Sequence, residues 1–181
     1  MNTILGSYTK DGINVPLEIS DYVQIELFGN HAKIQGLSML ISKLDLQKCL
    51  LYKWYLSKSG YPITYTSVDK KEKLGRGLKM HRFLEPLVPK GMVVDHINRD
   101  KLDNRRTNLR ICTIAENGYN KTRSGKYKGI RKTKKGWIAS ITKDGHKHEI
   151  RNIETEKQAA QTYDAMAEEL FGHFAAKNYE D

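Results

Sequence analysis

Residues 93–100 read Val-Val-Asp-His-Ile-Asn-Arg-Asp, and two asparagines follow at positions 108 and 117. Asn108 stands thirteen residues after Asp95, and Asn117 stands nine residues after Asn108. The oxygen atoms of Asp95 and Asn117 are ligands of the kind that a hard divalent cation prefers. The neutral imidazole of His96 can take a proton from water. The spacing therefore predicts the active site of a metal-dependent nuclease.

Short elements are expected on both sides of this stretch. The valines favour a strand that ends at the Asp-His pair, and a second strand is expected over residues 108–112. Thr113 and Glu116 have the spacing of a capping box, in which the Thr caps a helix and the Glu reaches back to it. Asn117 then lies in the first turns of that helix. Two strands and a helix are thus predicted to converge on one cation.

The composition bounds the class of partner. The chain has 181 residues, enough for one ordinary domain or two small ones, and a formal net charge of +10. This excess of positive charge favours a polyanionic partner. No apolar run approaches the roughly 18 residues that a membrane-spanning helix needs, and the first residues lack a signal-peptide pattern. A cytoplasmic protein without a membrane partner is expected, in the host cytoplasm if a phage encodes it.

The metal expected at the site is Mg²⁺ or Mn²⁺. Mg²⁺ usually keeps several waters and takes few protein ligands, which suits a set of two. The cysteines, Cys49 and Cys112, are too few for a disulfide framework or a four-cysteine site, so no structural zinc is expected.

Charge is distributed unevenly over the last third of the chain. Residues 121–151 contain eleven lysines and arginines and two acids, whereas residues 152–181 contain seven acids and two lysines. A basic stretch that precedes an acidic helix predicts a unit with one face toward DNA and the other toward water.

Residues 125–181 carry the signals of three antiparallel strands and one helix. We expect the strands over residues 126–132, 136–141 and 148–150. Asp144-Gly145 is a strong hairpin turn between the last two. A second capping box, formed by Thr155 and Gln158, starts a helix with apolar residues at helical spacing, and Gly172 ends it.

The first 78 residues read as short strands and turns. Alternation predicts a strand over 23–27, and residues 15–19 are strand-like as well. Residues 50–56 and 61–66 flank a Ser-Lys-Ser-Gly turn and predict a hairpin. The expected fold class is α+β, in three parts: a small β-rich region over 1–78, a ββα-metal nuclease core over 79–122, and a three-stranded antiparallel sheet packed on one helix over 125–181.

Residues 79–120 resemble the HNH nucleases of phages and of intron-encoded homing endonucleases. The match runs through several motif positions at the spacing of that family: His81-Arg82, Asp95-His96, Asp103-Asn104, Asn108-Leu109-Arg110 and Glu116-Asn117. The resemblance implies a hydrolase that cuts DNA phosphodiester bonds with one divalent metal ion. By position it assigns Asp95 and Asn117 as the metal ligands and His96 as the general base.

The same resemblance implies supporting roles for neighbouring residues. Asn108 corresponds to the middle Asn of the family name, which braces the loop and orients the backbone of the catalytic His. Asn104 is expected to shape the loop. His81 and Arg82 match a family pair beside the site, where they would serve as packing or phosphate contacts. Independently of the resemblance, the arginines that flank the active loop are expected to clamp phosphates: Arg99, Arg105 and Arg106.

Residues 125–179 look like the DNA-binding domain of plant ethylene-response factors, of the APETALA type, which also occurs fused to phage HNH enzymes. The marks are Tyr127-Lys128-Gly129-Ile130-Arg131, Trp137, the helix start over 159–164 and Ala176-Lys177-Asn178. The resemblance implies DNA contacts from residues of the sheet: Lys128, Arg131, Lys132, Trp137, Ser140 and Thr142. For Trp137 a place in the core under the helix is an equal alternative.

The leading hypothesis is a site-specific DNA endonuclease of the homing type that nicks double-stranded DNA. It would act as a monomer, or as a dimer on DNA, because one HNH site cuts one strand per binding event. A second hypothesis is a non-catalytic, sequence-specific DNA-binding regulator with an idle HNH fold. A third, a protein that binds or cleaves RNA, is less favoured because the sequence lacks the aromatic-rich RNA-recognition motif.

Overall fold

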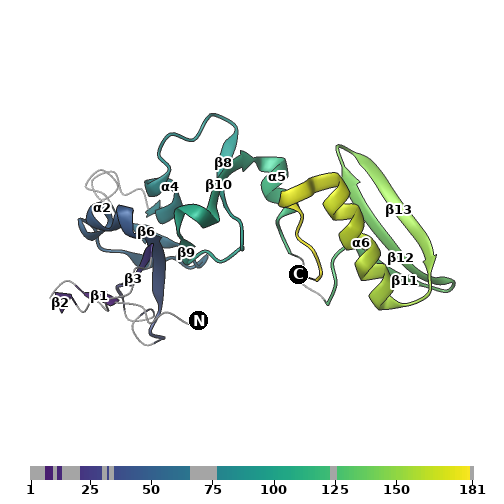
Figure 1. Ribbon diagram of the computed structural model, residues 1–181, viewed down its shortest axis with the longest axis horizontal. Coiled ribbons are helices and arrows are strands. Elements are labelled where there is room, and N and C mark those ends of the chain that lie inside the picture. Colours follow the sequence, from purple (N-terminus) through teal and green to yellow (C-terminus); the bar gives the residue numbers. More distant parts are fainter. Residues whose placement is uncertain are drawn as a thin grey trace. The chain divides into compact units, whose positions relative to one another are not determined.

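The computed structural model describes residues 7–9, 12–13, 21–29, 32, 35–65, 77–122 and 126–179. The chain divides into two compact units, Met1–Cys112 (unit 1) and Thr113–Asp181 (unit 2). Figure 1 traces both units, with unit 1 in purple to teal and unit 2 in green to yellow. The boundary lies inside the range 79–122, for which the sequence predicts one nuclease module.

Unit 1 contains a mixed sheet with the strand order β2-β1-β3-β4-β9. The strands are β1 (Ser7–Thr9), β2 (Gly12–Ile13), β3 (Tyr22–Glu26), β4 (Ser38–Ser42) and β9 (Asp103–Asn104). β3 and β4 are antiparallel, and β9 joins β4 in parallel. The alternation predicted for residues 23–27 is confirmed, because Val23 and Ile25 are buried and Glu26 is exposed. The expected strand over 15–19 lies outside the described residues.

A second sheet of unit 1 contains the predicted hairpin in a shorter form. Its strands are β5 (Tyr55–Leu56), β6 (Pro62–Thr64) and β7 (Leu78–Lys79). β5 and β6 pair antiparallel across the Ser57–Gly60 turn. The expectation of a strand over 50–56 is wrong for most of that range, because the helix α2 (Leu46–Leu50) and a turn precede β5. Leu46 and Cys49, three residues apart, are both buried, which is a helical rather than a strand period.

The core of unit 1 gathers residues from sheet and helices around the buried Trp54. Leu46 and Cys49 of α2 pack there with Met80 and Leu84 of α4 (Met80–Leu84). Trp54 donates its indole N–H to the Cys49 carbonyl at 2.9 Å. A short 3₁₀ helix, η1 (Lys43–Asp45), leads into α2. This core fixes α4, and with it His81, against the rest of unit 1.

Two further strands carry the motif residues of unit 1. β8 (Met92–His96) ends at the Asp-His pair, as predicted, and it pairs with β10 (Leu109–Thr113). The 3₁₀ helix η2 (Arg106–Asn108) leads into β10. Strand, loop and strand thus follow the predicted order.

Unit 2 contains a three-stranded antiparallel sheet with one long helix on it. The strands are β11 (Ile130–Thr133), β12 (Gly136–Lys143) and β13 (His146–Ile153), in that order. The helix α6 (Glu156–Phe171) packs on one face of the sheet through Ala139, Ile141 and Tyr163 (Figure 1). The shorter helices are α5 (Ile114–Tyr119) and η3 (Gly172–Phe174). This arrangement partly fits the one expected for residues 125–181. The strand expected over 126–132 begins only at Ile130, after four residues of bend, and the strands expected over 136–141 and 148–150 are longer in the structure.

Both capping boxes are confirmed. Thr113 accepts from the Glu116 amide at 3.2 Å, and the Glu116 carboxylate accepts from the Thr113 amide at 2.8 Å, which starts α5. Thr155 and Gln158 form the same pair of bonds at the start of α6. Gly172 ends α6 with a φ of 52°, a conformation that glycine adopts readily.

Candidate active site and nucleic-acid surface

The loop that follows Asp95 and His96 is closed by Asn108. Its side-chain oxygen accepts the Asn98 amide at 2.9 Å, and its Nδ2 donates to Asn98 Oδ1 at 2.9 Å and to the Asp103 carbonyl at 2.7 Å. The Asn108 carbonyl also accepts the Ile97 amide at 2.9 Å. These four bonds tie the start of the loop to its end. They are the bonds of a brace, which is the role that the resemblance implies for Asn108.

His96 is buried and its ring is held from one side by Asn104. The His96 Nε2 lies 3.2 Å from Asn104 Oδ1, and Asn104 Nδ2 donates to the Lys101 carbonyl at 3.1 Å. Because an amide oxygen only accepts hydrogen bonds, Nε2 is the donor and Nδ1 is the basic atom of the ring. Burial lowers the pKa of His96, while the Asn104 bond and nearby carboxylates oppose the shift. The imidazole is therefore neutral near pH 7, as a general base must be.

His81 lies beside His96. The two ring centroids are 5.1 Å apart with perpendicular planes, and Tyr61 contacts both rings, at 5.2 Å from His81 and 6.1 Å from His96. His81 is 7% exposed, and within the described residues its Nδ1 has no hydrogen-bond partner. Burial, followed by nearby positive charge, lowers the pKa of His81 to about 3. The imidazole of His81 is therefore uncharged near pH 7 and packs against the ring of the candidate base, His96.

Asp95, the expected metal ligand of unit 1, has an arginine as its counter-ion. Arg110 donates from Nε at 3.0 Å and from Nη2 at 2.8 Å, both to Asp95 Oδ2. The side chains of Arg110 and Asp95 are 12% and 8% exposed. The motif spacing alone predicts no role for Arg110. Its place on β10, the strand paired with β8, was the signal that could have shown it.

The donor set agrees with the expected metal in chemistry. A carboxylate and a neutral amide are hard oxygen donors, which suit Mg²⁺ or Mn²⁺. Across the described ranges no group of three or more His, Cys, Asp and Glu side chains forms a metal cluster. Asp95 belongs to unit 1 and Asn117 to unit 2. Their joint coordination of a metal therefore stays a prediction.

Two of the arginines expected to clamp phosphates are engaged in ion pairs. Arg105 contacts both oxygens of Asp103, at 2.8 and 2.6 Å. Arg106 contacts both oxygens of Asp45 at 2.8 Å and Glu85 at 3.2 Å. The two aspartates are almost fully buried, and these bonds lower their pKa against the opposing effect of burial. Phosphate contact by these two arginines stays a prediction.

The other two arginines expected to contact phosphates are Arg82 and Arg99. Arg82 is exposed on α4 and takes part in no ion pair among the residues that the structure describes. Arg99 lies in the braced loop with a φ of +67°, which is uncommon for a residue other than glycine. Both remain candidates for phosphate contact.

The face of the unit 2 sheet away from α6 is cationic. Residues paired across strands share a face, and the register pairs Arg131 with Ile138, Ser140 with Glu149 and Thr142 with Lys147. The Glu149 carboxylate lies between three cations, Arg131 at 3.7 Å, Arg151 at 2.5 Å and Lys147. Lys147 first, and then the two arginines, lower the pKa of Glu149. One carboxylate thus organises a surface with net positive charge.

Lys132 and Trp137 lie on the opposite face from Ser140 and Thr142. They pair with each other across β11 and β12, and Trp137 also pairs with Ile153, which packs against the core beneath α6. The Lys132 ammonium lies 5.9 Å from the centroid of the Trp137 ring. Trp137 is half-buried, so both alternatives, a place in the core and contact with DNA, stay predictions.

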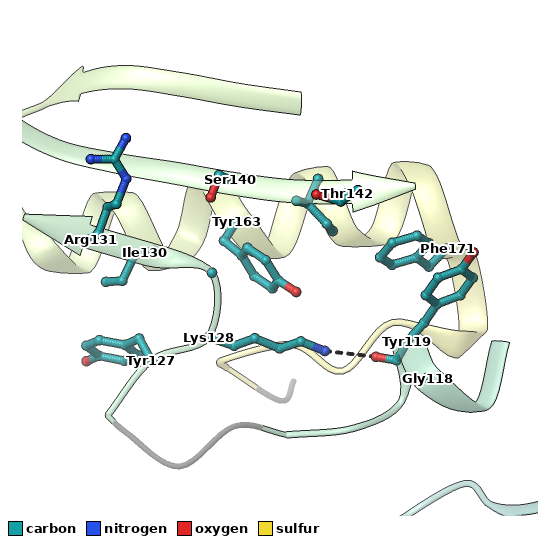
Figure 2. A pocket seen from close by; sticks show the side chains of 12 residues that line it. Gly118, Tyr119, Tyr127, Lys128, Ile130, Arg131, Ser140, Thr142, Tyr163 and Phe171 are labelled. Atoms are coloured by element: carbon teal, nitrogen blue, oxygen red, sulfur yellow. Dashed lines mark hydrogen bonds between the residues drawn. The ribbon is translucent and has the colours of Figure 1, made fainter. Parts of the chain in front are cut away.

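Lys128 holds its own unit together. Its ammonium donates to the Tyr119 carbonyl at 2.9 Å and to the Lys121 carbonyl at 2.7 Å, and its amide donates to Asn178 Oδ1 at 2.6 Å. Figure 2 shows the first of these bonds at the rim of a hollow of about 590 Å³. Next to this bond the Tyr119 ring stacks on Phe171, with centroids 3.8 Å apart. Lys128 therefore has acceptors within the protein, although the sequence predicts that it contacts DNA.

The C-terminal Asn178 closes unit 2. Its amide donates to Asp164 Oδ1 at 2.6 Å, and its Nδ2 donates to the Lys128 carbonyl at 3.1 Å. The neighbouring Tyr179 amide donates to Asp164 Oδ2 at 2.9 Å. The buried Asp164 thus fastens the last described residues to α6. Asn178 is a motif residue in the sequence, but the motif does not predict this contact with Asp164.

Comparisons with known proteins bear on the same residues. Residues 86–119 match a family model described as HNH endonuclease. "Uncharacterized HNH endonuclease L560" of Acanthamoeba polyphaga mimivirus is 48% identical over 133 residues, which cover 70% of this chain and 67% of that protein. "Protein 3.8" of Escherichia phage T7 is 31% identical over 94 residues, 49% of this chain and 77% of that protein. No solved structure matches. In the described part of the chain no helix is long and apolar enough to cross a membrane.

Proposed function

The chain belongs to the HNH endonuclease family, and on that premise we propose that it is a metal-dependent endonuclease that hydrolyses phosphodiester bonds of double-stranded DNA. The observation that carries the proposal is the setting of His96. A buried, neutral imidazole stands next to Asp95, and Asn108 braces the loop that follows it. This arrangement suits His96 as a general base and Asp95 as a charged ligand for a metal ion.

In the proposed reaction His96 Nδ1 takes a proton from the attacking water. Asn104 keeps the ring oriented through Nε2, so the basic nitrogen stays the same one throughout. The carboxylates of Asp95, Asp100 and Asp103 favour the imidazolium that forms. Asp95 and Asn117 would hold one Mg²⁺ or Mn²⁺, which neutralises charge on the phosphate and on the leaving 3′ oxygen. The products would carry 5′-phosphate and 3′-hydroxyl ends.

We propose that unit 2 supplies much of the DNA affinity. The proposal rests on the resemblance of residues 125–179 to the ethylene-response-factor domain and on the cationic face around Arg131. Ser140 and Thr142 alternate with the core residue Ile141 and so belong to that face. Lys132, Trp137 and Lys128 are expected to contribute less, because the first two lie on the helix side and the third donates to carbonyls.

The finer reading is a homing-type enzyme that nicks one strand. A single HNH site per chain would break one strand in each binding event. Cleavage of both strands would then need a dimer on DNA or a second binding event by the same monomer.

A nicking assay tests the proposal. Supercoiled plasmids that carry DNA from the flanks of the gene are incubated with Mg²⁺, Mn²⁺ or EDTA. We compare the wild type with His96→Ala, Asn117→Ala and, as a matched control, His173→Ala, which removes an exposed histidine of unit 2. Loss of a general base costs about 10²- to 10⁴-fold in rate. Open circles formed by the wild type and the control, but not by the two other variants or in EDTA, would support the proposal.

The opposite result has a specific meaning. If all four proteins shift duplex DNA and none nicks it under any metal condition, the chain is a DNA-binding regulator and the nuclease proposal fails. If duplex RNA is bound or cut in preference to DNA, the proposal that DNA is the substrate fails.

A further inference from the structure

Tyr61 lies at the meeting point of two cationic side chains and the two histidines. It follows the hairpin turn between β5 and β6, and its ring contacts His81 and His96. The Lys79 ammonium lies 4.0 Å from the centroid of the Tyr61 ring, and the Lys101 ammonium lies 4.8 Å from it. Both ammonium groups thus lie over the same ring that contacts the candidate general base, His96.

The two lysines reach this ring from different parts of unit 1. Lys79 ends β7, directly before α4, and Lys101 belongs to the loop between β8 and β9. The Lys101 ammonium also donates to the Ser59 carbonyl at 2.9 Å, which ties the loop to the hairpin turn. The convergence is therefore built by tertiary structure, since 22 positions of sequence separate the two residues.

Lys79, Arg82 and Lys101 bring three positive charges into one part of unit 1. Of the ion pairs between described residues of unit 1, none includes Lys79, Arg82 or Lys101. Burial first, and then repulsion by Lys101 and Arg82, lowers the pKa of Lys79. Elsewhere in unit 1 arginines stand next to buried aspartates. A cluster of like charges costs free energy in the isolated protein and becomes favourable when an anion binds.

We propose that Lys79 and Lys101 form a subsite for a backbone phosphate of duplex DNA, next to the phosphate at which His96 acts. Ammonium groups bind phosphates as point charges and need no fixed plane, which suits two flexible lysines on one ring. The aromatic ring limits the positions of both ammonium groups and so prepares them for the ligand. The subsite rests on the proposed function and adds two residues to which no role was assigned.

A purely structural role makes a different prediction. If Lys101 only fastens the turn through Ser59, its loss lowers the stability of unit 1 and leaves the salt dependence of DNA binding unchanged. A phosphate contact instead adds to the counterions released on binding, so its loss flattens that dependence. Salt dependence and thermal stability, measured together, separate the two roles.

The test measures equilibrium binding of a duplex taken from the flanks of the gene, in EDTA, over a series of NaCl concentrations. The variants are Lys79→Met, Lys101→Met, the double variant and Lys79→Arg. The matched control is Lys53→Met, because Lys53 also lies over an aromatic ring, that of Phe28, at 5.6 Å. Each phosphate-binding lysine should lower the magnitude of the slope of log K against log salt by about one when it is lost. Affinity at low salt should fall several-fold for each single variant.

The expected result is a reduced slope for both single variants and a larger reduction for the double variant. Lys53→Met and Lys79→Arg should keep the wild-type slope, because the first lies in another cluster and the second keeps the charge. An unchanged slope in the double variant, with a folded protein by circular dichroism, overturns the inference. If Lys101→Met does not fold, Lys79→Met and Lys79→Arg decide the question alone.

The outcome is independent of the nuclease assay. Wild-type nicking with unchanged salt slopes would leave the proposed function intact and remove the subsite. Reduced slopes in a protein that never nicks would keep the phosphate subsite and remove the proposed function.

Discussion

The two units of this protein use charge in opposite ways. In unit 1 each of three buried aspartates has an arginine as its counter-ion; the pairs are Asp95–Arg110, Asp103–Arg105 and Asp45–Arg106. In unit 2 a single carboxylate, Glu149, whose side chain is only 9% exposed, is shared by three cations whose side chains are each more than half exposed. The first arrangement leaves little charge unbalanced and fixes the loops near His96. The second leaves positive charge available to a polyanion.

The energetic consequences differ in the same direction. A buried charge that loses its partner costs several kcal/mol, because neither water nor another charge replaces the partner. An exposed ion pair contributes little to stability, and salt screens it. Substitutions of the arginines in the three buried pairs of unit 1 should therefore change stability, whereas substitutions of the exposed cations on the sheet face of unit 2 should change DNA binding.

The largest effect is expected for Arg110→Met. The variant leaves Asp95 buried without its counter-ion, so unit 1 should lose about 3–5 kcal/mol of unfolding free energy. Chemical unfolding in EDTA, followed by Trp54 fluorescence in a Trp137→Phe background, reports on unit 1 alone, because these are the two tryptophans of the chain. Arg82→Met is the control, an exposed arginine of the same unit. A loss below about 1 kcal/mol would mean that water reaches Asp95 in the native state and replaces the arginine.

A smaller effect is expected from pH through His81. Its pKa is about 3 in the folded protein and about 6.5 in an unfolded chain. Between these values the unfolded state binds a proton that the folded state excludes, so stability falls as pH falls below 6.5. The loss per pH unit reaches about 1.4 kcal/mol. The unfolding free energy of unit 1, measured between pH 7 and pH 5, reports this loss. The aspartates Asp45 and Asp103 titrate below that pH range, because their pKa values are lowered from the ordinary value.

The control for this prediction is His81→Phe, which keeps a buried ring and removes the titrating group. Its stability should vary less between pH 7 and 5 than that of the wild type. The remainder should come from His96, whose pKa is lowered too. An equal pH dependence in both proteins would show that His81 is not the group that titrates.

In unit 2, Lys128→Met should lower stability by about 1–2 kcal/mol, because two charged hydrogen bonds to carbonyls are lost. Arg131→Met, on the cationic face, should do the reverse: little change in stability and a weaker affinity for duplex DNA. Hydrogen exchange of the α6 amides measures the first property, and a binding titration measures the second. If Lys128→Met weakens DNA binding more than Arg131→Met does, the assignment of their roles is inverted.

The smallest effect is expected for Glu149→Gln. It removes the carboxylate that three cations share, so duplex DNA should bind several-fold more tightly and with a steeper salt dependence. Glu169→Gln, an exposed glutamate of α6, changes the net charge by the same amount on the helix side. Equal gains in both variants would mean that net charge, and not the sheet face, determines the affinity.

The sequence predicted what depends on neighbouring residues. Both capping boxes, the alternation of β3 and the Asp144-Gly145 turn between β12 and β13 need only a few residues of context, and each is present. The strand that ends at Asp95 and His96 was predicted for the same reason. The spacing of the motif was sufficient to bring His96, Asn104 and Asn108 into one braced loop.

What could not be predicted depends on partners far apart in the chain. Arg106 pairs with Asp45, 61 positions away, so its role as a counter-ion was not visible beside the active loop. Lys128 was interpreted as part of a basic face, yet its acceptors are carbonyls at the end of α5 and just after it. The helix α2 was missed because five residues are too few for a clear helical period. In each case tertiary structure decided between two uses of the same side chain.

Both cysteines of the chain, Cys49 and Cys112, are fully buried, and burial raises the pKa of the Cys49 thiol to about 12. Thiol-directed dyes react with exposed thiolates, so the folded protein should not react with maleimide dyes. One new surface cysteine in each unit could then be labelled without removing the natural ones. A donor and an acceptor dye at those positions would report, in single molecules, whether the distance between the units changes when duplex DNA is added.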